Sequence, residues 1–561
     1  MQKLLYNPDT VDFIIRRSEF SESIINNYEV AIAHTLAGRY AIGYARQDVF
    51  MELRKVFGSE TISISSIVLG LLDRASLEAS GILQVHNQPY LELKGQGVII
   101  GIIDTGIDYT LDVFKYEDGT SKIQYIYDQT VEGPPPRNYF LGTEYTNAQI
   151  NAALQSENPE LIVPEIDTSG HGTFLASVAA GREIGDFIGA APDAEIIAVK
   201  LKRARQYYLD LYSVPLDQEN AFESNAIMLG VEYIIDRARE LGRPVAICIG
   251  LGSNFGSHDA FSIFVEYLSG VSNIRGVCLC VAAGNETQAK HHTQGVISTK
   301  GESQNIDIRI GENAGDLTVS IWTGAADRVS VAIRSPTGEF IPRIPARSGD
   351  VIFTNLILEQ SSIRVSYFYP VEGTGGQLSA VKIINSTPGI WTITVYGDLI
   401  LDGTFHAWLP LTGFVDPSVE FLASNPNYTI TVPATMTGAI ISGAYNARQN
   451  SLYANSSWGP SRTGELVPDL VAPGVNIGGY YPYGFGFMSG TSVATSIVTG
   501  ASALMLEWGI VQGNRPAFSS FQIRAFMIRG CDRNENMIYP NNRWGYGSLN
   551  LLQTFELMRE Q

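Results

Sequence analysis

The stretch Gly490-Thr491-Ser492-Val493-Ala494 opens an apolar run that decides how the rest of the chain is interpreted. Apolar residues follow at spacings of three and four, at Ile497, Val498, Ala501, Leu504 and Met505. This spacing predicts a buried helix with Gly-Thr-Ser at its first turn. A serine there lies at the positive end of the helix macrodipole, beside N–H groups that could stabilise an oxyanion. Taken alone, the pattern also fits an ordinary Ser/Thr cap on a core helix.

The composition and charge of the chain limit what it can bind. Its 561 residues can hold two or three domains around a large core, with apolar and charged fractions typical of a globular protein. The formal net charge of −19 argues against nucleic acid or an anionic membrane as a partner. No apolar run reaches transmembrane length, so we expect no membrane span.

The N-terminus and the cysteines indicate the compartment. Residues 1–8 contain no hydrophobic signal core, so we expect no signal peptide and a chain made in the cytoplasm. The four cysteines have neither zinc-ligand spacing nor a catalytic motif: Cys248, Cys278, Cys280 and Cys531. Three of them lie in runs that predict buried strands, so reduced structural thiols in a non-oxidising compartment are expected.

Strands alternate with helices in two long parts of the chain, residues 73–291 and 425–561. Val98-Ile99-Ile100-Gly101-Ile102-Ile103 is a continuous apolar run that ends in Asp104, and such runs are typical of parallel strands covered on both faces. Similar runs cover 195–199, 245–249 and 276–281, with helical patterns around 222–239 and 261–268. The pattern predicts a doubly wound α/β domain with a mostly parallel sheet, in which sites gather at the carboxyl ends of the strands.

Two further units have different patterns. Residues 1–72 predict a small α+β unit, with strands over 28–33 and 61–71 and a helix over 49–57. Residues 292–424 predict an antiparallel β-sandwich inserted into the α/β domain, because many short runs alternate with period two between turn residues. The clearest runs are 306–310, 317–321, 329–333, 363–367 and 391–395. The insert has no catalytic candidate, since His406 stands alone.

Four polar residues lie where the α/β pattern places strand ends and helix starts. Asp104 ends the first core strand, His171 precedes a helix of small residues, and Ser492 starts the late helix. A serine hydroxyl needs an imidazole to take its proton and a carboxylate to orient that imidazole; the chain order Asp, His, Ser is that of subtilisin. Asn285 follows a buried strand and can donate its side-chain amide to an oxyanion. Each residue alone also fits a turn or a loop, but the four together indicate a nucleophilic site.

The motifs around these residues resemble the signature blocks of subtilisin-like serine proteases. The resembling blocks are Asp104-Thr105-Gly106-Ile107-Asp108, Gly170-His171-Gly172-Thr173, Ala283-Gly284-Asn285 and Gly490-Thr491-Ser492-Val493-Ala494. Gly250-Leu251-Gly252-Ser253 resembles the strand that lines the substrate pocket, and Ala472-Pro473-Gly474 precedes the serine block. The resemblance covers about 76–291 and 425–555.

The resemblance implies roles for seven residues. Asp104, His171 and Ser492 would form the catalytic triad, and Asn285 would contribute to the oxyanion hole. Gly250, Leu251 and Gly252 would bind substrate. One departure is Ser496-Ile497-Val498, where subtilases usually carry Pro-His-Val. Subtilases often bind calcium, but no Asp or Glu here forms a loop that we can assign to it, so we expect no cofactor and name no metal ligand.

The arrangement of the units resembles one subfamily, the Csp germination proteases of clostridial spores. The likeness rests on the N-terminal unit without a signal peptide, the sandwich between Asn285 and Ser492, and the stretches 253–259 and 539–547. It implies a prodomain over 1–72, a jelly-roll-like insert and packaging in the spore. The protein substrate would be the precursor (zymogen) of a spore-cortex hydrolase.

Three functions remain open at this point. The intact Asp104, His171 and Ser492 favour a processing endopeptidase over a pseudoprotease that senses a germinant or scaffolds a partner. The missing signal peptide disfavours a general degradative protease. Subtilase prodomains present their last strand to the active site as a first substrate. The resemblance therefore implies one self-cleavage between about 70 and 76, after which the prodomain stays bound as an inhibitor.

Overall fold

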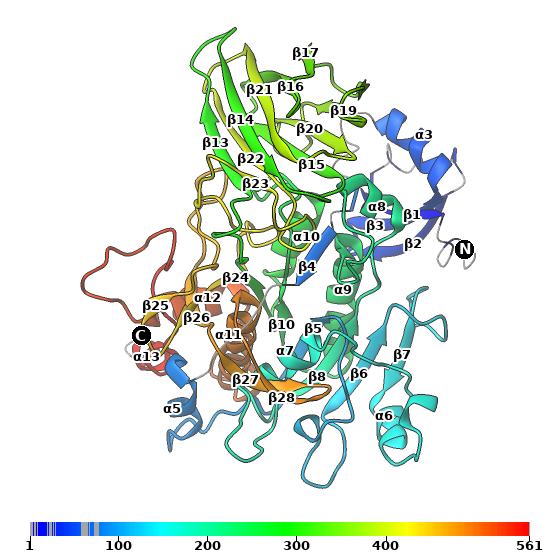
Figure 1. Ribbon diagram of the computed structural model, residues 1–561. Coiled ribbons are helices and arrows are strands. Elements are labelled where there is room, and N and C mark those ends of the chain that lie inside the picture. The colour runs from blue at the N-terminus through cyan, green and yellow to red at the C-terminus, as the bar shows by residue number, and fades with distance from the viewer. Residues whose placement is uncertain are drawn as a thin grey trace.

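The computed structural model describes residues 78–559 without a gap. Ahead of them it describes 9–18, 27–28, 30–57, 65–66 and 68–71, with Leu4, Asn7, Ser21 and Ile25 as single positions. Three parts are visible in Figure 1: an α/β body around a central sheet, two antiparallel sheets at the top, and an N-terminal unit on the right.

A mostly parallel sheet forms the centre of the α/β body. Nine strands of the described residues take part, in the order β25-β24-β12-β10-β5-β8-β6-β7 with β26 beside β24. Their bounds are β5 (Ile99–Asp104), β6 (Ile123–Asp128), β7 (Thr143–Thr146), β8 (Glu195–Lys200), β10 (Val245–Ile249), β12 (Val277–Ala282), β24 (Ile440–Asn446), β25 (Ser451–Leu452) and β26 (Leu470–Pro473). The end strands β7 and β25 run antiparallel to their neighbours. This confirms the predicted mostly parallel sheet.

Helices cover both faces of this sheet. One face carries α5 (Ile82–His86), α6 (Asn147–Leu154), α7 (His171–Ala180), α11 (Thr491–Leu506), α12 (Ser520–Gly530) and α13 (Leu551–Met558); the other carries α9 (Ser224–Glu240) and α10 (Ile263–Val271). In β5, Ile100 and Ile102 join the first core while Ile99 and Ile103 join the second. The strand is therefore apolar at successive positions because alternate side chains enter two different cores.

Short elements fill the connections. Helix α9 begins two residues later than the sequence pattern indicated, because Phe222 and Glu223 form strand β9 (Phe222–Glu223). The remaining helical elements are α8 (Gln206–Tyr212), the 3-10 turns η2 (Glu78–Ser80), η3 (Asp112–Phe114) and η4 (Pro159–Leu161), and the π-helical turn η5 (Glu507–Val511) after α11.

One helical stretch corrects an expectation from the sequence. Among the described residues, Thr491–Val511 has the length and mean hydropathy, 1.3, of a helix that could cross a membrane, although no apolar run was expected to reach that length. Of its most apolar window, 89% is buried inside the protein. Its hydropathy matches its place in the core of the α/β body.

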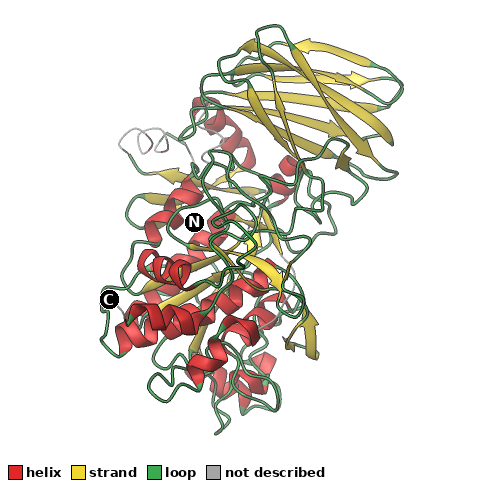
Figure 2. Ribbon diagram, turned by 90° about the vertical axis from the view of Figure 1, so that its left-hand side faces the viewer, coloured by secondary structure: helices red, strands yellow, loops and turns green. Residues whose placement is uncertain are grey.

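The insert consists of two antiparallel sheets that face each other (Figure 2). The first contains β13 (His292–Val296), β22 (Thr404–Trp408), β15 (Leu317–Thr323), β20 (Gln377–Ile384), β19 (Ser361–Phe368) and β18 (Val351–Leu356). The second contains β17 (Phe340–Ile344), β16 (Arg328–Arg334), β21 (Gly389–Leu399), β14 (Ser303–Ile310) and β23 (Glu420–Phe421). Trp391 and Val381, one from each sheet, are fully buried in a shared core. All five predicted runs are strands, whereas the jelly-roll-like order stays a prediction.

Among its described residues, the N-terminal unit contains a three-stranded antiparallel sheet and, after it, an 11-residue helix. The strands β1 (Thr10–Arg16), β3 (Tyr40–Arg46) and β2 (Val30–Leu36) pair in that order, followed by α3 (Gln47–Phe57). One face packs on α9 and α10 through Ile14 and Tyr40, and the other packs on α3 and α8 through Phe13. Of the strand predicted over 61–71, the described part is β4 (Val68–Leu71) and a bridge at Ser65; residues 61–64 and 67 lie outside the described residues.

His406 belongs to a stack of rings between the insert and the α/β body, so the expectation that it stands alone is wrong. It lies on β22, whose partner strand β13 places His292 opposite Trp408. The ring nitrogens His292 Nε2 and His406 Nδ1 are 3.1 Å apart, and the His258 ring stacks on Trp408 with ring centroids 4.1 Å apart. Pairing of strands distant in sequence creates this cluster, which sequence spacing alone does not reveal.

We predict that this stack makes the protein less stable in acid. Burial lowers the pKa of His292 to about 3 and that of His406 to about 2. Between about pH 6.5, the usual value, and these folded values the unfolded chain binds protons that the folded chain excludes, so each histidine lowers the free energy of unfolding by about 1.4 kcal/mol per pH unit of acidification. The transition temperature of wild type should fall more steeply between pH 7 and 5 than that of His406→Gln. Parallel curves would show that His406 does not titrate on unfolding.

Candidate active site

Ser492 lies in the first turn of α11, where the sequence predicted it. The hairpin β27 (Ile477–Tyr481) and β28 (Gly484–Met488) leads into this turn, and Gly490 caps the helix. The Ser492 side chain is fully buried, and its Oγ donates a hydrogen bond to the Gly250 carbonyl oxygen at 3.1 Å. The hydroxyl group therefore lies between the start of α11 and the carboxyl end of β10.

His171 and Asp104 are joined by a hydrogen bond. Asp104 is the last residue of β5, His171 is the first residue of α7, and His171 Nδ1 lies 2.8 Å from Asp104 Oδ1. A carboxylate accepts only, so Nδ1 carries the proton and Nε2 is the ring nitrogen that can accept one. Gly172 permits this contact, because a Cβ there would lie 2.3 Å from the Gly106 carbonyl oxygen.

Gly250 is the point at which the serine and the imidazole meet. A Cβ on Gly250 would lie 3.2 Å from Ser492 Cβ and 3.5 Å from His171 Cε1. The two side chains, 321 positions apart in a chain of 561 residues, therefore flank the same backbone position. An acceptor nitrogen and a serine hydroxyl so arranged can perform nucleophilic attack on a carbonyl group.

Asn285 lies beside the same helix start. Its Oδ1 accepts hydrogen bonds from Thr491 N at 3.1 Å and from Thr491 Oγ1 at 3.3 Å. Since the oxygen of the amide faces Thr491, the Nδ2 donor of the same group points away from Thr491. A donor next to the N-terminus of α11 is suited to an oxyanion formed at Ser492.

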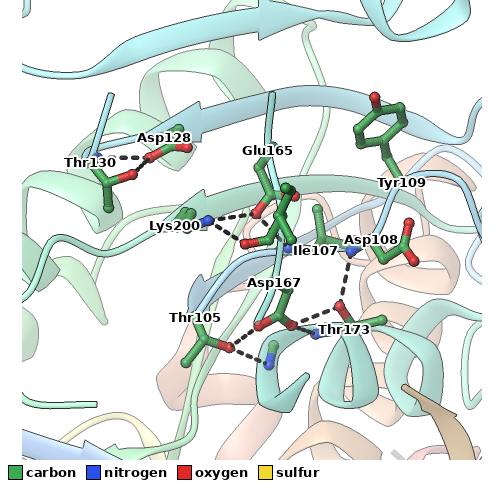
Figure 3. A network of polar contacts seen from close by, with 12 residues as sticks. Thr105, Ile107, Asp108, Tyr109, Asp128, Thr130, Glu165, Asp167, Thr173 and Lys200 are labelled. Atoms are coloured by element: carbon green, nitrogen blue, oxygen red, sulfur yellow. Dashed lines mark hydrogen bonds and ion pairs between the residues drawn. The ribbon is translucent and has the colours of Figure 1, made fainter. Parts of the chain in front are cut away.

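Asp167 is a buried residue of the site that the sequence analysis missed (Figure 3). Its Oδ1 accepts from Thr105 Oγ1 at 2.7 Å and Gly170 N at 2.8 Å, and its Oδ2 accepts from Thr173 N at 2.9 Å and Thr173 Oγ1 at 2.7 Å. The carboxylate thus ties the residue after Asp104 to both sides of His171. It also caps α7, whose N-cap glycine has no side chain, and so fixes His171 relative to Asp104.

A second buried carboxylate, Glu165, lies behind the same loop. Its Oε1 is 3.3 Å from Ile107 N and 3.5 Å from Lys200 Nζ. Burial raises the pKa of Glu165 well above its usual value, although the Lys200 charge opposes this. Burial therefore favours the neutral acid at this position, and the Lys200 ammonium favours the carboxylate.

Strand β4 occupies the position next to Gly250–Gly252. It pairs antiparallel with β11 (Leu251–Gly252), Leu71 opposite Leu251 and Gly70 opposite Gly252. On its other side it pairs antiparallel with β9, Val68 opposite Glu223. An extended segment of the N-terminal part therefore lies as a middle strand in a three-stranded sheet that leads towards Ser492. Residues 72–77, which follow it, lie outside the described residues.

Burial disfavours thiolate formation at the cysteines. The four cysteines are buried and unpaired, and burial raises the pKa of Cys248 and of Cys531 to about 12. Within the described part of the chain, no group of three or more His, Cys, Asp and Glu side chains is placed to hold a metal ion.

Comparison with known proteins places these residues in context. The model of the Subtilase family matches residues 95–321 and 419–547, and the unmatched part between them falls within the two antiparallel sheets. The solved structure of the Clostridium perfringens CspB protease is 33% identical, with a TM-score of 0.76 over 86% of this chain and 98% of that one. The PII-type proteinase of Lacticaseibacillus paracasei is 21% identical over 84% of this chain, and the subtilisin-like protease SBT2.2 of Arabidopsis thaliana is 24% identical over 74%. The chain spans 25% and 55% of the length of these two curated relatives.

We predict that Asp167→Ala destabilises the protein strongly. Removing the carboxylate leaves four donors without their acceptor in a buried place, which should cost about 3 kcal/mol or more. Thermal unfolding measures this loss. The matched control is Asp118→Ala, since that carboxylate accepts from Thr120 N and Oγ1 in an exposed turn. Equal transition temperatures for the two variants would contradict a bracing role for Asp167.

Proposed function

The chain belongs to the subtilase family, and we propose that it is a serine endopeptidase that cuts itself once and then activates a protein precursor by limited proteolysis. The observation that carries this proposal is that Ser492 and His171 flank Gly250 while Asp104 forms a hydrogen bond with His171 Nδ1. In this arrangement the imidazole is oriented by a carboxylate and lies beside the serine, which is the chemistry that acyl transfer requires.

The proposed reaction uses the chain's own groups. The Ser492 hydroxyl turns from the Gly250 carbonyl to His171 Nε2, gives up its proton and attacks the scissile carbonyl carbon. Asp104 stabilises the imidazolium, and Asn285 Nδ2 with the N–H groups at the start of α11 stabilises the oxyanion. His171 then protonates the leaving amine. In the second half of the reaction, a water molecule gives a proton to His171 and attacks the carbonyl carbon of the acyl-enzyme. His171 returns this proton to the Ser492 oxygen as the acid product leaves.

The first substrate in this proposal is the chain itself. Strand β4 supplies backbone hydrogen bonds on both edges, as a bound extended peptide does. Gly70 and Leu71 lie opposite Gly252 and Leu251, and the next residue along that edge, Gly250, accepts the Ser492 hydrogen bond. We therefore expect the cut between residues 71 and 76.

After the cut, the N-terminal unit (residues 1–72) acts as a bound inhibitor in this proposal. Strands β1 and β3 of its sheet are buried on both faces, and the fully buried Asp12 accepts a hydrogen bond from Arg205 Nε at 2.9 Å and one from Lys202 Nζ. Tyr208 Oη donates to the Asp12 carbonyl oxygen at 2.6 Å. Separating the unit would leave Lys202 and Arg205 without this carboxylate, which opposes release.

The second substrate is proposed from the resemblance to Csp germination proteases. A role in the spore, with the precursor of a cortex hydrolase as substrate and packaging of the enzyme in the spore, agrees with a processing protease that keeps its inhibitor bound. The likeness to the CspB protease over nearly the whole length of that chain supports this subfamily.

We expect purified wild type to consist of two fragments and Ser492→Ala of one uncut chain. Intact mass spectrometry under denaturing conditions measures this and locates the cut bond. Ser502→Ala is the matched control, because Ser502 lies in the same helix and its Oγ donates to the Val498 carbonyl oxygen. One uncut chain in wild type and Ser492→Ala alike would argue for the pseudoprotease that acts as sensor or scaffold.

We expect Asn285→Ala to slow the self-cleavage by about 10²–10³-fold, as loss of one oxyanion donor does. The measurement is the first-order rate at which refolded, uncut chain becomes two fragments. Substrate and enzyme are one molecule here, so the rate reports the chemical step without a contribution from association. Asn273→Ala, at an exposed position in the turn after α10, is the control. A wild-type rate in Asn285→Ala would remove Asn285 from the oxyanion hole.

A further inference from the structure

Glu286 directly follows Asn285 and is almost fully buried, with 2% of its surface exposed. Its Oε2 accepts hydrogen bonds from Asn254 Nδ2 at 3.0 Å and from His291 Nδ1 at 2.9 Å. The backbone N–H of Thr412 lies 3.3 Å from Oε1. Three segments that are distant in sequence therefore meet at one side chain.

The three partners of Glu286 come from two parts of the molecule, the α/β body and the insert. Asn254 lies two residues after Gly252, the end of the strand that pairs with β4. His291 is the residue before β13, and Thr412 follows β22, so both lie at the base of the insert. Through Glu286, the base of the insert is connected to Asn254, which follows β11, and to Asn285, which precedes Glu286 in the chain.

The contacts of this carboxylate favour its ionised form. Burial alone would raise the pKa of Glu286, but the hydrogen bonds from His291, Thr412 and Asn254 outweigh burial and lower the pKa. Hydrogen bonds to an ionised acceptor are about twice as strong as neutral ones. These hydrogen bonds therefore hold the Glu286 side chain in one position.

The backbone around Asn285 has anchors on the opposite side. Ser457 N donates to the Gly284 carbonyl oxygen at 2.8 Å, and Glu286 N donates to Ser457 Oγ at 3.0 Å. Asn285 lies between these two bonds. With the carboxylate of Glu286 bound to the insert, the short turn that carries Asn285 is held from two directions.

We propose that Glu286 is a positioning residue through which the inserted sheets hold Asn285 and the 250–254 strand in place for the reaction. The inference rests on the proposed function, since it assigns Asn285 to the oxyanion. Glu286 does not contact the reacting atoms. It sets the distance between the amide donor and the substrate strand, and an error of about 1 Å there can cost about 100-fold in rate.

The test is a double-mutant cycle on the rate of self-cleavage. Glu286→Ala is made in wild type and in Asn285→Ala. We expect a fall of about tenfold or more in wild type and less than about threefold in Asn285→Ala, because the donor that Glu286 positions is then already gone. Equal slowing in both backgrounds would mean a general structural role and would overturn the proposal, as would an unchanged rate in wild type.

Two further variants keep the cycle informative. Glu286→Gln preserves the volume and an acceptor oxygen and should recover most of the rate lost in Glu286→Ala. Glu420→Ala is the matched control, because Glu420 pairs with Lys290, the neighbour of His291, at the surface of the same junction. It should cleave at the wild-type rate; slowing equal to that of Glu286→Ala would overturn the specific role of Glu286.

A second measurement does not depend on activity. In the Ser492→Ala background, hydrogen–deuterium exchange should rise over 283–287 and 250–254 when Glu286 is changed to Ala, with no change in α9. Unchanged exchange in those two stretches would overturn the positioning role even if the protein is a protease. If wild type does not cut itself, the proposed function fails, and the exchange experiment still decides whether Glu286 holds the two stretches.

Discussion

The geometry of the site depends on how closely two helices approach the end of one strand. Helices α7 and α11 meet beside β10 because the residues between them are small: a Cβ on Gly500 would lie 2.3 Å from Ala190 Cβ and 3.1 Å from the Ala179 carbonyl oxygen. Helix separation follows the size of the side chains at the contact. Larger residues there would move Ser492 or His171 away from Gly250, so the small residues of these helices are a condition for the chemistry.

Local patterns in the sequence predicted the strands and helices, because the spacing of apolar residues follows which faces of an element are buried. Continuous apolar runs such as 98–103 correspond to strands that enter two cores, and period-two alternation corresponds to the strands of the insert. The strand and helix ends also follow from local signals, which is why Asp104, His171 and Ser492 could be singled out before their separation was known. The His171–Asp104 hydrogen bond is the contact that a carboxylate orienting an imidazole requires.

Polar contacts between distant segments could not be predicted in the same way. Nothing in Glu165-Ile166-Asp167 indicates that Asp167 will meet Thr105, and nothing near His406 indicates His292. Such partners are set by strand register and by the path of loops, which depend on the whole fold. The predicted strand over 61–71 shows the same limit: its pairing with β9 and β11 depends on two segments more than a hundred residues away.

The middle strand β4 has a consequence for how any other protein chain could bind. In the proposed function β4 occupies the substrate position. A segment attached to its own binding site is present at a high effective concentration, so an external substrate would have to compete with it. The apparent affinity for that substrate equals its intrinsic affinity multiplied by the fraction of time during which the position is vacant. The response of the molecule to a partner would then be governed by the occupancy of this one strand position, and a partner that holds β4 away would act as an activator without touching Ser492.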